Sequence, residues 1–501
     1  MIVTRFAPSP TGYIHIGNIR SAIYPWLLAR QDQDGDFILR IEDTDRLRYV
    51  EGATDKILET LTWLGLNWNE GPEVGGPHAP YYQSERRELY QEFADKLLEK
   101  GRAYYDPTPA ATVDEYRKAD AAAKRPFLFR NHRPNNISVA GDPQHTYPIR
   151  FVSDPKPRAW HDEVMGDLSA GPEVQDDIIL IKADGLPTYN FAHIVDDFLM
   201  GVTHIIRGSE YLSSMPNYLA IYEALDITPP KFVSLPHVLA SQGNKKLSKR
   251  DGAKSVTDYR DDGILPEALL NYLACLGWND GTEQEIYTRQ ELIEKFSLDR
   301  IQTSGARFDE QKLFWTNGQW IRRIATENNP EAHNPRADGY SLATERGINE
   351  LYSRTTDFWP ESAASASDEH KKQVLHIIYD RLKTLSDLRE MTDYFFKDPE
   401  IDLEMLKSNK FLKKLSPEAL KSLLDTSIAK LDSLSTFTPD AVQDALNALL
   451  EETGEKPATL FSLLRLAVSF APFSPALNLT FSILGKDTVM TRLQNTTEKI
   501  K

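Results

Sequence analysis

The stretch "RFAPSPTGYIHIGN", residues 5–18, decides how the N-terminal part of this chain folds. The apolar run "IVTRFA" (2–7) predicts a buried strand, and "IRSAIYPWLLAR" (19–30) predicts a helix in which Pro25 introduces a bend or a turn. Pro8 and Pro10 stiffen the connection between them, and Gly12 relaxes it. A helix N-terminus exposes unpaired N–H groups and the positive end of the helix dipole. The stretch therefore predicts a strand, an anion-binding loop and a helix in succession.

The same alternation continues beyond this stretch. "DFILRI" (36–41) predicts a second strand, and "EGATDKILETLTWLGL" (51–66) predicts an amphipathic helix. This order favours a parallel α/β sheet. The pattern resumes later in the chain, with strands expected at 176–183, 203–208 and 231–236 and a helix at 214–225.

The rest of the chain differs in character. Residues 72–175 are rich in Pro, Tyr and Arg, and they predict an insertion that splits the sheet domain without forming a second independent sheet. From about residue 265 periodic apolar faces predict helices, and 327–339 predicts a linker or loop. We expect an α/β fold with a Rossmann-like parallel-sheet domain, split by the insertion and followed by a mainly α-helical half. The expected division is 1–82 with 185–242, then 83–184, 243–326, 327–405 and 406–501.

Composition limits the function classes. The one cysteine excludes a disulfide within the chain and a zinc site built on cysteines. No apolar run has the length of a membrane span and no leader pattern opens the chain, so we expect a cytoplasmic protein without a membrane partner. The net charge of -16 argues against indiscriminate polyanion binding. A local basic face stays open, at 124–136 or 407–421, although each stretch also fits a solvated surface.

The opening loop carries candidate ligands for phosphate. Thr11, His15 and Asn18 can donate hydrogen bonds to phosphate oxygens, and Gly17 lets a ligand approach the backbone closely. Neither common glycine-rich nucleotide loop occurs in the chain. Taken alone, the stretch fits a structural turn capped by Asn18 equally well.

A second candidate phosphate loop is "GNKKLSKRDGAK", residues 243–254. It is bounded by glycines, so it could swing onto a triphosphate and move with pyrophosphate as that group leaves. Taken alone, it also fits a basic surface loop. Its polar residues are Lys245, Lys246, Ser248, Lys249 and Arg250.

Together these two loops resemble the signature motifs of class I aminoacyl-tRNA synthetases, as "PSPTGYIHIGN" and "KLSKR". The segments 40–72 and 184–211 resemble the glutamyl-tRNA synthetase family of bacterial or organellar type, and 462–493 resembles the anticodon-binding end of that family. The resemblance implies ATP-dependent activation of L-glutamate to glutamyl-adenylate and transfer to the 3′-terminal ribose of tRNA(Glu). It also implies that tRNA binds before glutamate is activated.

Glutamate itself dictates the chemistry of its pocket. Two carboxylates and one ammonium call for two cationic anchors and one anionic anchor. Arg5, Arg207 and Glu42 stand at the carboxyl ends of predicted strands, where open α/β sheets bind ligands. Tyr189 and His193 are four residues apart and would share one helix face. The resemblance implies that glutamate contacts Arg5, Ala7, Ser9, Glu42, Tyr189, His193 and Arg207, although position 193 is often asparagine in relatives.

The resemblance also implies roles for the two loops. It assigns catalysis to His15, Asn18, Lys246 and Lys249. It assigns ATP binding to Thr11, His15, Gly17, Asn18, Glu210, Lys246, Ser248, Lys249 and Arg250. Mg²⁺ would arrive with ATP, and Asp43 and Asp45 are expected to cap a helix rather than to bind a metal.

The remaining expectations concern partners and domain roles. The resemblance implies a monomer whose partners are ATP, L-glutamate and tRNA(Glu), with 83–184 binding the acceptor stem, 243–326 contacting the stem, and 327–405 and 406–501 binding the anticodon. Some relatives bind zinc through cysteines in the insertion, but "AYYDPTPAATVDEY" (103–116) holds none, so we expect no zinc. The chain departs from the pattern at Asn18, where the superfamily usually has histidine, and at "SFAPFSP" (469–475).

Three alternatives stay open at this point. The enzyme could charge tRNA(Gln) as well as tRNA(Glu). It could be a glutaminyl-type synthetase, although its C-terminal half predicts helices rather than β-barrels. It could be a non-catalytic tRNA-binding paralogue, but such a protein should have lost His15 or Lys249, and both are present.

Overall fold

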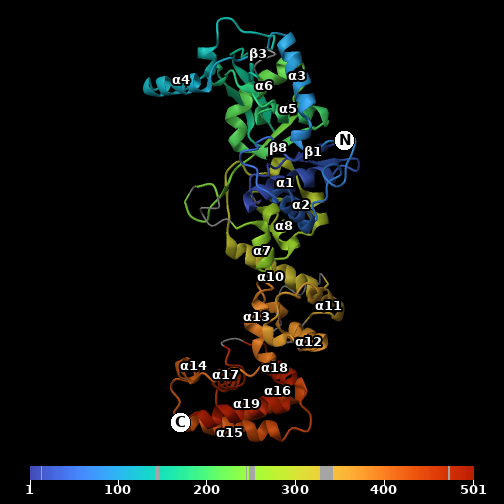
Figure 1. Cartoon of the computed structure of the whole chain (residues 1–501). Helices are drawn as coiled ribbons and strands as arrows, with labels where there is room; N and C mark the ends of the chain where they lie inside the picture. Colours follow the sequence, from blue (N-terminus) through green and yellow to red (C-terminus); the bar gives the residue numbers. More distant parts are fainter. Residues whose placement is uncertain are drawn as a thin grey trace. The chain divides into compact units, whose positions relative to one another are not determined.

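A computed structural model describes residues 1–12, 14–141, 146–243, 245–247, 254–327, 342–471 and 474–500 (Figure 1). The chain forms two compact units. Unit 1 consists of Met1–Tyr259 and Leu269–Glu310, and unit 2 consists of Arg260–Ala268 and Gln311–Lys501.

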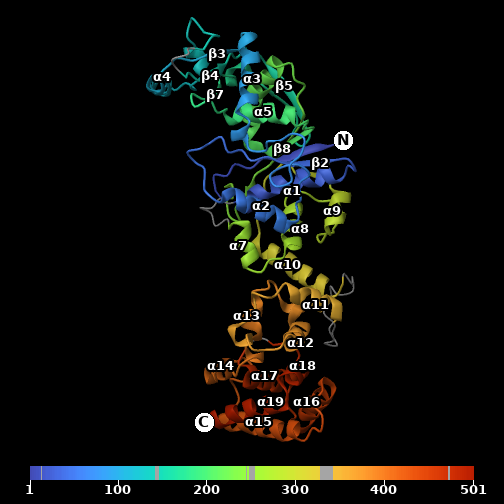
Figure 2. The ribbon, with the colours of Figure 1, turned by 45° about the vertical axis from the view of Figure 1, so that its right-hand side comes forward.

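Unit 1 contains the predicted parallel strands. β1 (Val3–Phe6) pairs in parallel with β2 (Asp36–Leu39), and β8 (His204–Gly208) pairs in parallel with β9 (Lys231–Leu235). β1 and β8 lie side by side (Figure 1), and the Thr203 N–H donates to Val3 O at 2.9 Å at their amino ends. Figure 2 shows β8 and β2 in the same region of unit 1. The sheet order is therefore β2-β1-β8-β9, and the carboxyl ends of these strands share one edge.

Helices connect these strands as the apolar periodicity predicts. α1 (Ile16–Arg30) begins three residues earlier than expected, after an N-cap at His15, and it continues through Pro25 without ending. α2 (Ala53–Leu64) ends at Gly65, which adopts the left-handed conformation that glycine allows. α5 (Tyr189–Leu199) precedes β8, and α6 (Met215–Ala224) follows it after the 3₁₀ segment η4 (Ser209–Ser214).

The insertion differs from the prediction, because it contains a sheet of its own. β3 (Ala103–Tyr105), β4 (Ile149–Phe151) and β7 (Ile179–Ile181) form an antiparallel sheet. The strand expected at 176–183 therefore belongs to this sheet and not to the parallel one. The hairpin of β5 (Arg158–Asp162) and β6 (Gly166–Ala170) adds to the parallel sheet instead, where Asp162 pairs with Phe232 of β9. The other elements of the insertion are η1 (Gln83–Glu85), α3 (Arg87–Glu99), α4 (Ala110–Ala122), η2 (Phe129–His132) and η3 (Pro172–Val174).

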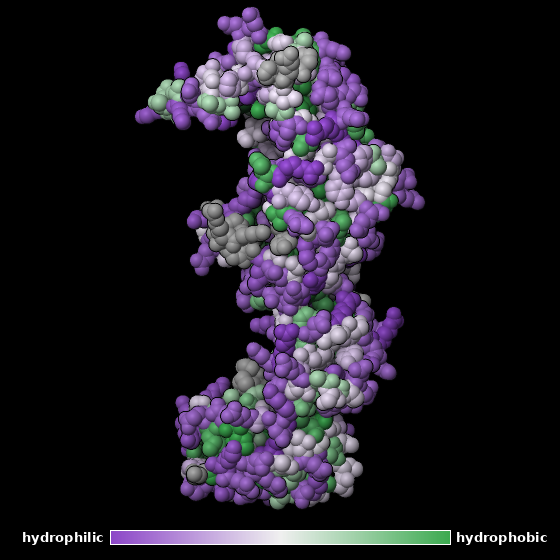
Figure 3. Space-filling model, in the orientation of Figure 1, coloured by the Kyte–Doolittle hydropathy of each residue, from purple (hydrophilic) through white to green (hydrophobic). Residues whose placement is uncertain are grey.

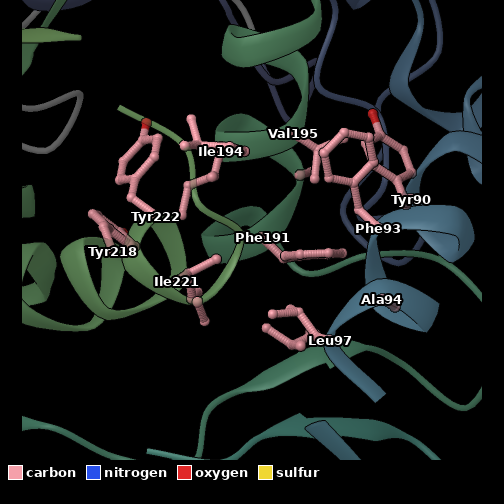
Figure 4. Close-up of a cluster of buried hydrophobic side chains, with 14 of the residues drawn as sticks. Tyr90, Phe93, Ala94, Leu97, Phe191, Ile194, Val195, Tyr218, Ile221 and Tyr222 are labelled. Carbon is pink, nitrogen blue, oxygen red and sulfur yellow. The ribbon is translucent and has the colours of Figure 1, made fainter. Parts of the chain in front are cut away.

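One hydrophobic core joins the insertion to the sheet domain. Figure 4 shows Tyr90 and Phe93 of α3 beside Val195 of α5, and Phe191 of α5 above Leu97 of α3. The same buried cluster includes residues of α6 and of both sheets. The insertion is therefore packed onto the sheet domain through α5, the helix that leads into β8.

Unit 1 continues with short elements after β9. β10 (Val238–Leu239) pairs with β11 (Ala306–Arg307), and the first helix after them along the chain is α10 (Glu310–Ala325), most of which belongs to unit 2. The segments between β10 and β11 along the chain are α7 (Val256–Asp261), α8 (Pro266–Cys275), α9 (Arg289–Lys295) and η6 (Leu298–Arg300). Of these, the end of α7 and the start of α8 fall within Arg260–Ala268 and belong to unit 2.

Every regular element among the described residues of unit 2 is a helix, as predicted. Ser416 and Thr438 each cap a helix whose first residue is proline, a pairing that favours helix starts. In the view of Figure 3, hydrophilic side chains predominate on the surface, while the leucine-rich helix faces form a buried core. The linker predicted at 327–339 lies, apart from Glu327, outside the described residues. The elements are α11 (Glu345–Ser353), η8 (Glu361–Ala363), α12 (Asp368–Ile378), η9 (Tyr379–Arg381), α13 (Asp387–Thr392), η10 (Asp393–Phe395), α14 (Leu403–Ser408), α15 (Pro417–Asp432), α16 (Pro439–Thr453), α17 (Pro457–Ser469), α18 (Leu477–Leu484) and α19 (Lys486–Lys499).

Candidate active site

A cavity of about 610 Å³ opens at the carboxyl ends of β1, β8 and β9 in unit 1. It brings together nearly all of the predicted site residues that the structure describes. Those that line it are Arg5, Ala7, Ser9, Thr11, His15, Gly17, Asn18, Glu42, Tyr189, Arg207, Glu210 and Lys246. His193 does not line the cavity, and Ser248, Lys249 and Arg250 lie outside the described residues.

The phosphate-loop end of the cavity is organised around His15. Its side chain, and not that of Asn18, caps α1, since Nδ1 accepts a hydrogen bond from the Gly17 N–H at 3.1 Å. The proton of the neutral imidazole must then be on Nε2. A Cβ at Gly17 would lie 3.1 Å from Cε1 of His15, so glycine lets the ring lie against the backbone. Asn18 is exposed in the first turn of the helix.

Arg207, at the end of β8, is one of two buried arginines in the cavity wall that form no ion pair among the described residues. The other is Arg20 of α1, which donates to the carbonyl oxygens of Leu276 and Pro236. The side chain of Arg207 contacts neutral groups instead of a carboxylate. NH2 donates to the sulfur of Met215, and the guanidinium lies 5.0 Å from the ring centre of Tyr211 and 4.9 Å from that of Tyr218. A buried guanidinium held only by neutral groups favours an anionic ligand.

His193 acts on Arg207 from behind the wall. Its Nδ1 lies 2.8 Å from Tyr189 O, which can only accept, so Nδ1 carries the proton and Nε2 accepts from NH1 of Arg207 at 3.2 Å. Burial first, and then the charge of Arg207, lower the pKa of His193 to about 3. The predicted shared helix face is confirmed, because the rings of Tyr189 and His193 stack with centres 4.9 Å apart. Only Tyr189, however, reaches the cavity.

Arg5 and Glu42 provide opposite charges in the cavity wall. Arg5 forms a bidentate ion pair with Asp197 of α5, at 3.0 Å (Nε–Oδ1) and 3.2 Å (NH2–Oδ2). Glu42 Oε1 accepts from NH2 of Arg40 at 3.2 Å. Burial raises the pKa of Glu42 to about 7 although Arg40 and Arg5 oppose the shift. Of the two predicted arginine anchors, Arg207 is therefore the one without a carboxylate partner in the part of the chain that the structure describes.

Glu210 and Lys246 occupy the part of the wall nearest the second loop. Lys246 Nζ lies 2.8 Å from Glu210 Oε1, and Nδ1 of His237 lies 3.6 Å from Glu210 Oε2. Burial alone would raise the pKa of Glu210, but the hydrogen bond and charge of Lys246 outweigh it, so the pKa is lowered. The pair joins two residues that were both expected to bind ATP.

Asp43 and Asp45 do not cap α2, contrary to the prediction. Asp43 accepts hydrogen bonds from the backbone N–H and hydroxyl of Ser84, and Asp45 pairs with Arg48. α2 instead follows Gly52, with no side-chain cap. Within the described residues, no three His, Cys, Asp or Glu side chains gather in a way that could hold a metal ion.

The sequence reasoning missed the residues that hold the anchors. Arg40, Asp196 and Asp197 are buried and paired with one another and with Arg5 and Glu42. The signal was present, since two adjacent aspartates interrupt the otherwise apolar helix sequence "FAHIVDDFL". Such acids need buried cationic partners when they lie in a core.

The two candidate basic faces, 124–136 and 407–421, differ in how far acidic residues neutralise them. In 124–136, Arg125 pairs with Asp120 and Arg133 pairs with Asp177, so part of its charge is neutralised internally. In 407–421, Lys407 pairs with Glu404, whereas the remaining lysines are exposed. No helix among the described residues is long and apolar enough to cross a membrane.

Comparisons with known proteins show which family this chain resembles over its length. The family described as "tRNA synthetases class I (E and Q), catalytic domain" matches residues 1–315, and "Anticodon binding domain" matches residues 350–497. A glutamate–tRNA ligase from Clostridium botulinum (strain Hall) is 39% identical over 99% of this chain and 98% of its own length. A glutamate–tRNA ligase from Dehalococcoides mccartyi is 36% identical over 98% of this chain and 96% of its own length. The crystal structure of a glutamate–tRNA ligase from Elizabethkingia meningosepticum, in complex with its amino acid, matches with a TM-score of 0.85 at 31% identity, with full coverage of both chains.

Proposed function

Because this chain belongs to the glutamate–tRNA ligase family of class I tRNA synthetases, we propose that its cavity activates L-glutamate with ATP and transfers it to tRNA(Glu). The observation that carries the proposal is Arg207, a buried guanidinium in the cavity wall without a carboxylate partner among the described residues. A carboxylate of the substrate pairs with the guanidinium of Arg207. Glu42, in the same cavity, pairs with the substrate ammonium.

Arg5 contributes to glutamate binding in a different way from Arg207. Since Asp197 already holds its guanidinium in a bidentate pair, Arg5 contributes positive potential from a fixed position. Tyr189, Ala7 and Ser9 complete the amino-acid end of the cavity. A planar guanidinium can donate to both oxygens of a carboxylate but to only one oxygen of an amide, so this arrangement favours glutamate over glutamine.

ATP binds at the other end of the same cavity. Thr11, Gly17, Asn18 and Nε2 of His15 face the phosphates at the N-terminus of α1, and Lys246 and Glu210 lie beyond them. Lys249, Ser248 and Arg250 complete this part by resemblance, and Mg²⁺ enters as the counter-ion of ATP.

The reaction needs no side-chain nucleophile. An oxygen of the glutamate α-carboxylate bonds to the α-phosphorus of ATP while the bond to the bridging oxygen breaks, and pyrophosphate leaves with both electrons of that bond. The terminal ribose hydroxyl of tRNA then attacks the activated carbonyl carbon, and AMP leaves. The residues of the cavity position the reactants and stabilise the charge that develops on the phosphate oxygens.

The domain roles and physical state belong to the same proposal. The insertion 83–184 binds the acceptor stem, 243–326 contacts the stem, and 327–405 and 406–501 bind the anticodon arm. The protein is a cytoplasmic monomer that needs no zinc and requires bound tRNA for activation. Light scattering of the purified chain tests the monomer, and metal analysis tests the zinc content.

Aminoacylation of purified tRNAs tests the central function. We expect ATP-dependent charging of tRNA(Glu) with labelled glutamate and none with glutamine. The same assay with tRNA(Gln) decides whether the enzyme also makes a misacylated product. Failure to charge either tRNA with glutamate would contradict the proposal.

A further inference from the structure

Six charged side chains form a buried network behind the amino-acid end of the cavity. Three arginines face three acidic residues, and each of the six residues is at most 5% exposed. The network reaches from β1 and the end of β2, through α5, to the start of the insertion. Its members are Arg5, Arg40, Arg86, Glu42, Asp196 and Asp197.

Arg40 lies at the centre of this network. Its side chain is fully buried and does not line the cavity. NH1 donates to Asp197 Oδ1 at 2.8 Å, NH2 donates to Glu42 Oε1 at 3.2 Å, and Nε lies 3.5 Å from Asp196 Oδ2. One planar guanidinium thus contacts three carboxylates in three directions.

Two of these carboxylates lead to the cavity. Glu42 lines it directly, and Asp197 holds Arg5, which lines it too. The third, Asp196, leads away from the cavity toward the insertion, where it accepts from Gln83 Nε2, Arg86 Nε and Tyr90 OH, each at 2.8 Å. Arg40 is therefore the one member of the network that contacts both the cavity branch and the insertion branch.

We propose that Arg40 is a positioning residue for amino-acid recognition, which fixes Glu42 directly and Arg5 through Asp197 without touching the substrate. This inference rests on the proposed function and extends it to a residue outside the cavity. One planar guanidinium holds Glu42 and Asp197, and Asp197 in turn holds Arg5, so the position of Arg40 affects both charged groups of the cavity. Lysine cannot replace this guanidinium, because its single ammonium group cannot contact all three carboxylates at once.

Arg40→Lys tests this role, with Arg86→Lys as the matched control. Arg86 is equally buried and belongs to the same network, but it contacts only Asp196 and the carbonyls of His78 and Pro80. We expect Arg40→Lys to raise KM for glutamate by at least about tenfold and to change KM for ATP by less than about twofold. Arg86→Lys should lower the melting temperature comparably and change KM for glutamate by less than about threefold.

A pH profile separates positioning from loss of stability. Glu42 faces Arg40 and Arg5, with Asp197 and Tyr189 of α5 and Tyr211 of η4 also acting on it. Lysine keeps the positive charge but loses the hydrogen bond that NH2 of Arg40 donates to Glu42 Oε1. Because that hydrogen bond favours ionised Glu42, the acid limb of kcat/KM for glutamate should move to higher pH in Arg40→Lys. If Arg40→Lys only lowers the stability of the protein, the acid limb should stay at the same pH as in the wild type.

Three outcomes would overturn the inference. These are an unchanged KM for glutamate in Arg40→Lys, an equal increase in Arg86→Lys, and an unshifted acid limb. If Arg40→Lys does not fold, Asp197→Asn tests the same path, because Asp197 Oδ1 accepts from both Arg40 and Arg5. It should raise KM for glutamate by at least about tenfold, and no increase overturns the inference. Failure of the proposed function itself would be distinguishable, because the wild-type chain would then not charge tRNA with glutamate.

Discussion

Nε2 of His193 lies 3.2 Å from NH1 of Arg207 and accepts its hydrogen bond, so a neutral imidazole supports a buried guanidinium. A carboxylate in place of the imidazole would neutralise Arg207 and compete with an anionic substrate. The neutral ring orients the cation and leaves its charge available to the cavity. The pairing therefore matches a pocket that must bind a carboxylate.

Arg207→Lys should impair glutamate binding specifically. Loss of the guanidinium removes a charge-assisted contact of about 1.5–3 kcal/mol, which corresponds to an increase in KM for glutamate of about 10- to 100-fold. KM for ATP should change little. Arg158→Lys is the control, because Arg158 is similarly buried in unit 1 but pairs with Glu223 and does not line the cavity. Similar KM values in both variants would contradict the role of Arg207.

His193 should tolerate asparagine better than leucine. Asparagine keeps an oxygen that can accept from Arg207, whereas leucine leaves the buried guanidinium without this partner. We expect KM for glutamate to change by less than about fivefold in His193→Asn and to rise by at least about tenfold in His193→Leu. Equal effects of the two substitutions on KM would show that the hydrogen bond to Arg207 is not what matters.

Glu42 should make glutamate recognition depend on pH near neutrality. Its pKa is raised to about 7 by burial, so below that pH the carboxyl is protonated and cannot pair with the substrate ammonium. We expect kcat/KM for glutamate to be level above this range and to fall by about tenfold per pH unit below it.

Two measurements control this pH profile. Glu42→Gln should lower kcat/KM for glutamate and remove the acid limb, because no carboxyl remains to titrate. The profile of kcat/KM for ATP at saturating glutamate corrects for titration of the nucleotide. An acid limb that persists unchanged in Glu42→Gln would assign it to another group.

Gly17→Ala should separate catalysis from stability. A Cβ at this position would lie 3.1 Å from Cε1 and 3.2 Å from Nδ1 of His15, so the imidazole must shift. We expect kcat of aminoacylation to fall while KM for glutamate stays constant. The melting temperature should stay level or rise, because alanine favours a helix over glycine by roughly 0.5–1 kcal/mol. An unchanged kcat would show that the position of His15 is not critical.

Lys249→Ala should slow adenylate formation far more than it weakens tRNA binding. The lysine is expected to act on the phosphates as pyrophosphate leaves, so its effect should appear in pyrophosphate exchange measured with tRNA present. Lys245→Ala, in the same basic loop, is the matched control and should retain nearly the wild-type rate. Equal losses in exchange and in tRNA affinity would count against this role.

Local sequence features predicted much of the fold. Apolar runs and helical periodicity located β1, β2, β8, β9, α2 and the helical half, because strand and helix formation depends mainly on neighbouring residues. The antiparallel sheet β3-β4-β7 was missed, because its strands are three residues long and are separated by up to forty-odd residues of other structure. Such pairings leave little periodicity to detect.

The sequence by itself determined which residues could form the site. Thr11, His15, Glu42, Arg207 and Lys246 were all identified from their residue types and from motif order, and they line one cavity. The tertiary structure decided how their charges are used. In the folded chain Asp197 forms an ion pair with Arg5, whereas Arg207 donates to the neutral His193. Arg40 donates to both Glu42 and Asp197 from outside the cavity. Ion pairing depends on distances of a few ångströms between elements remote in sequence, and only the packed fold fixes those distances.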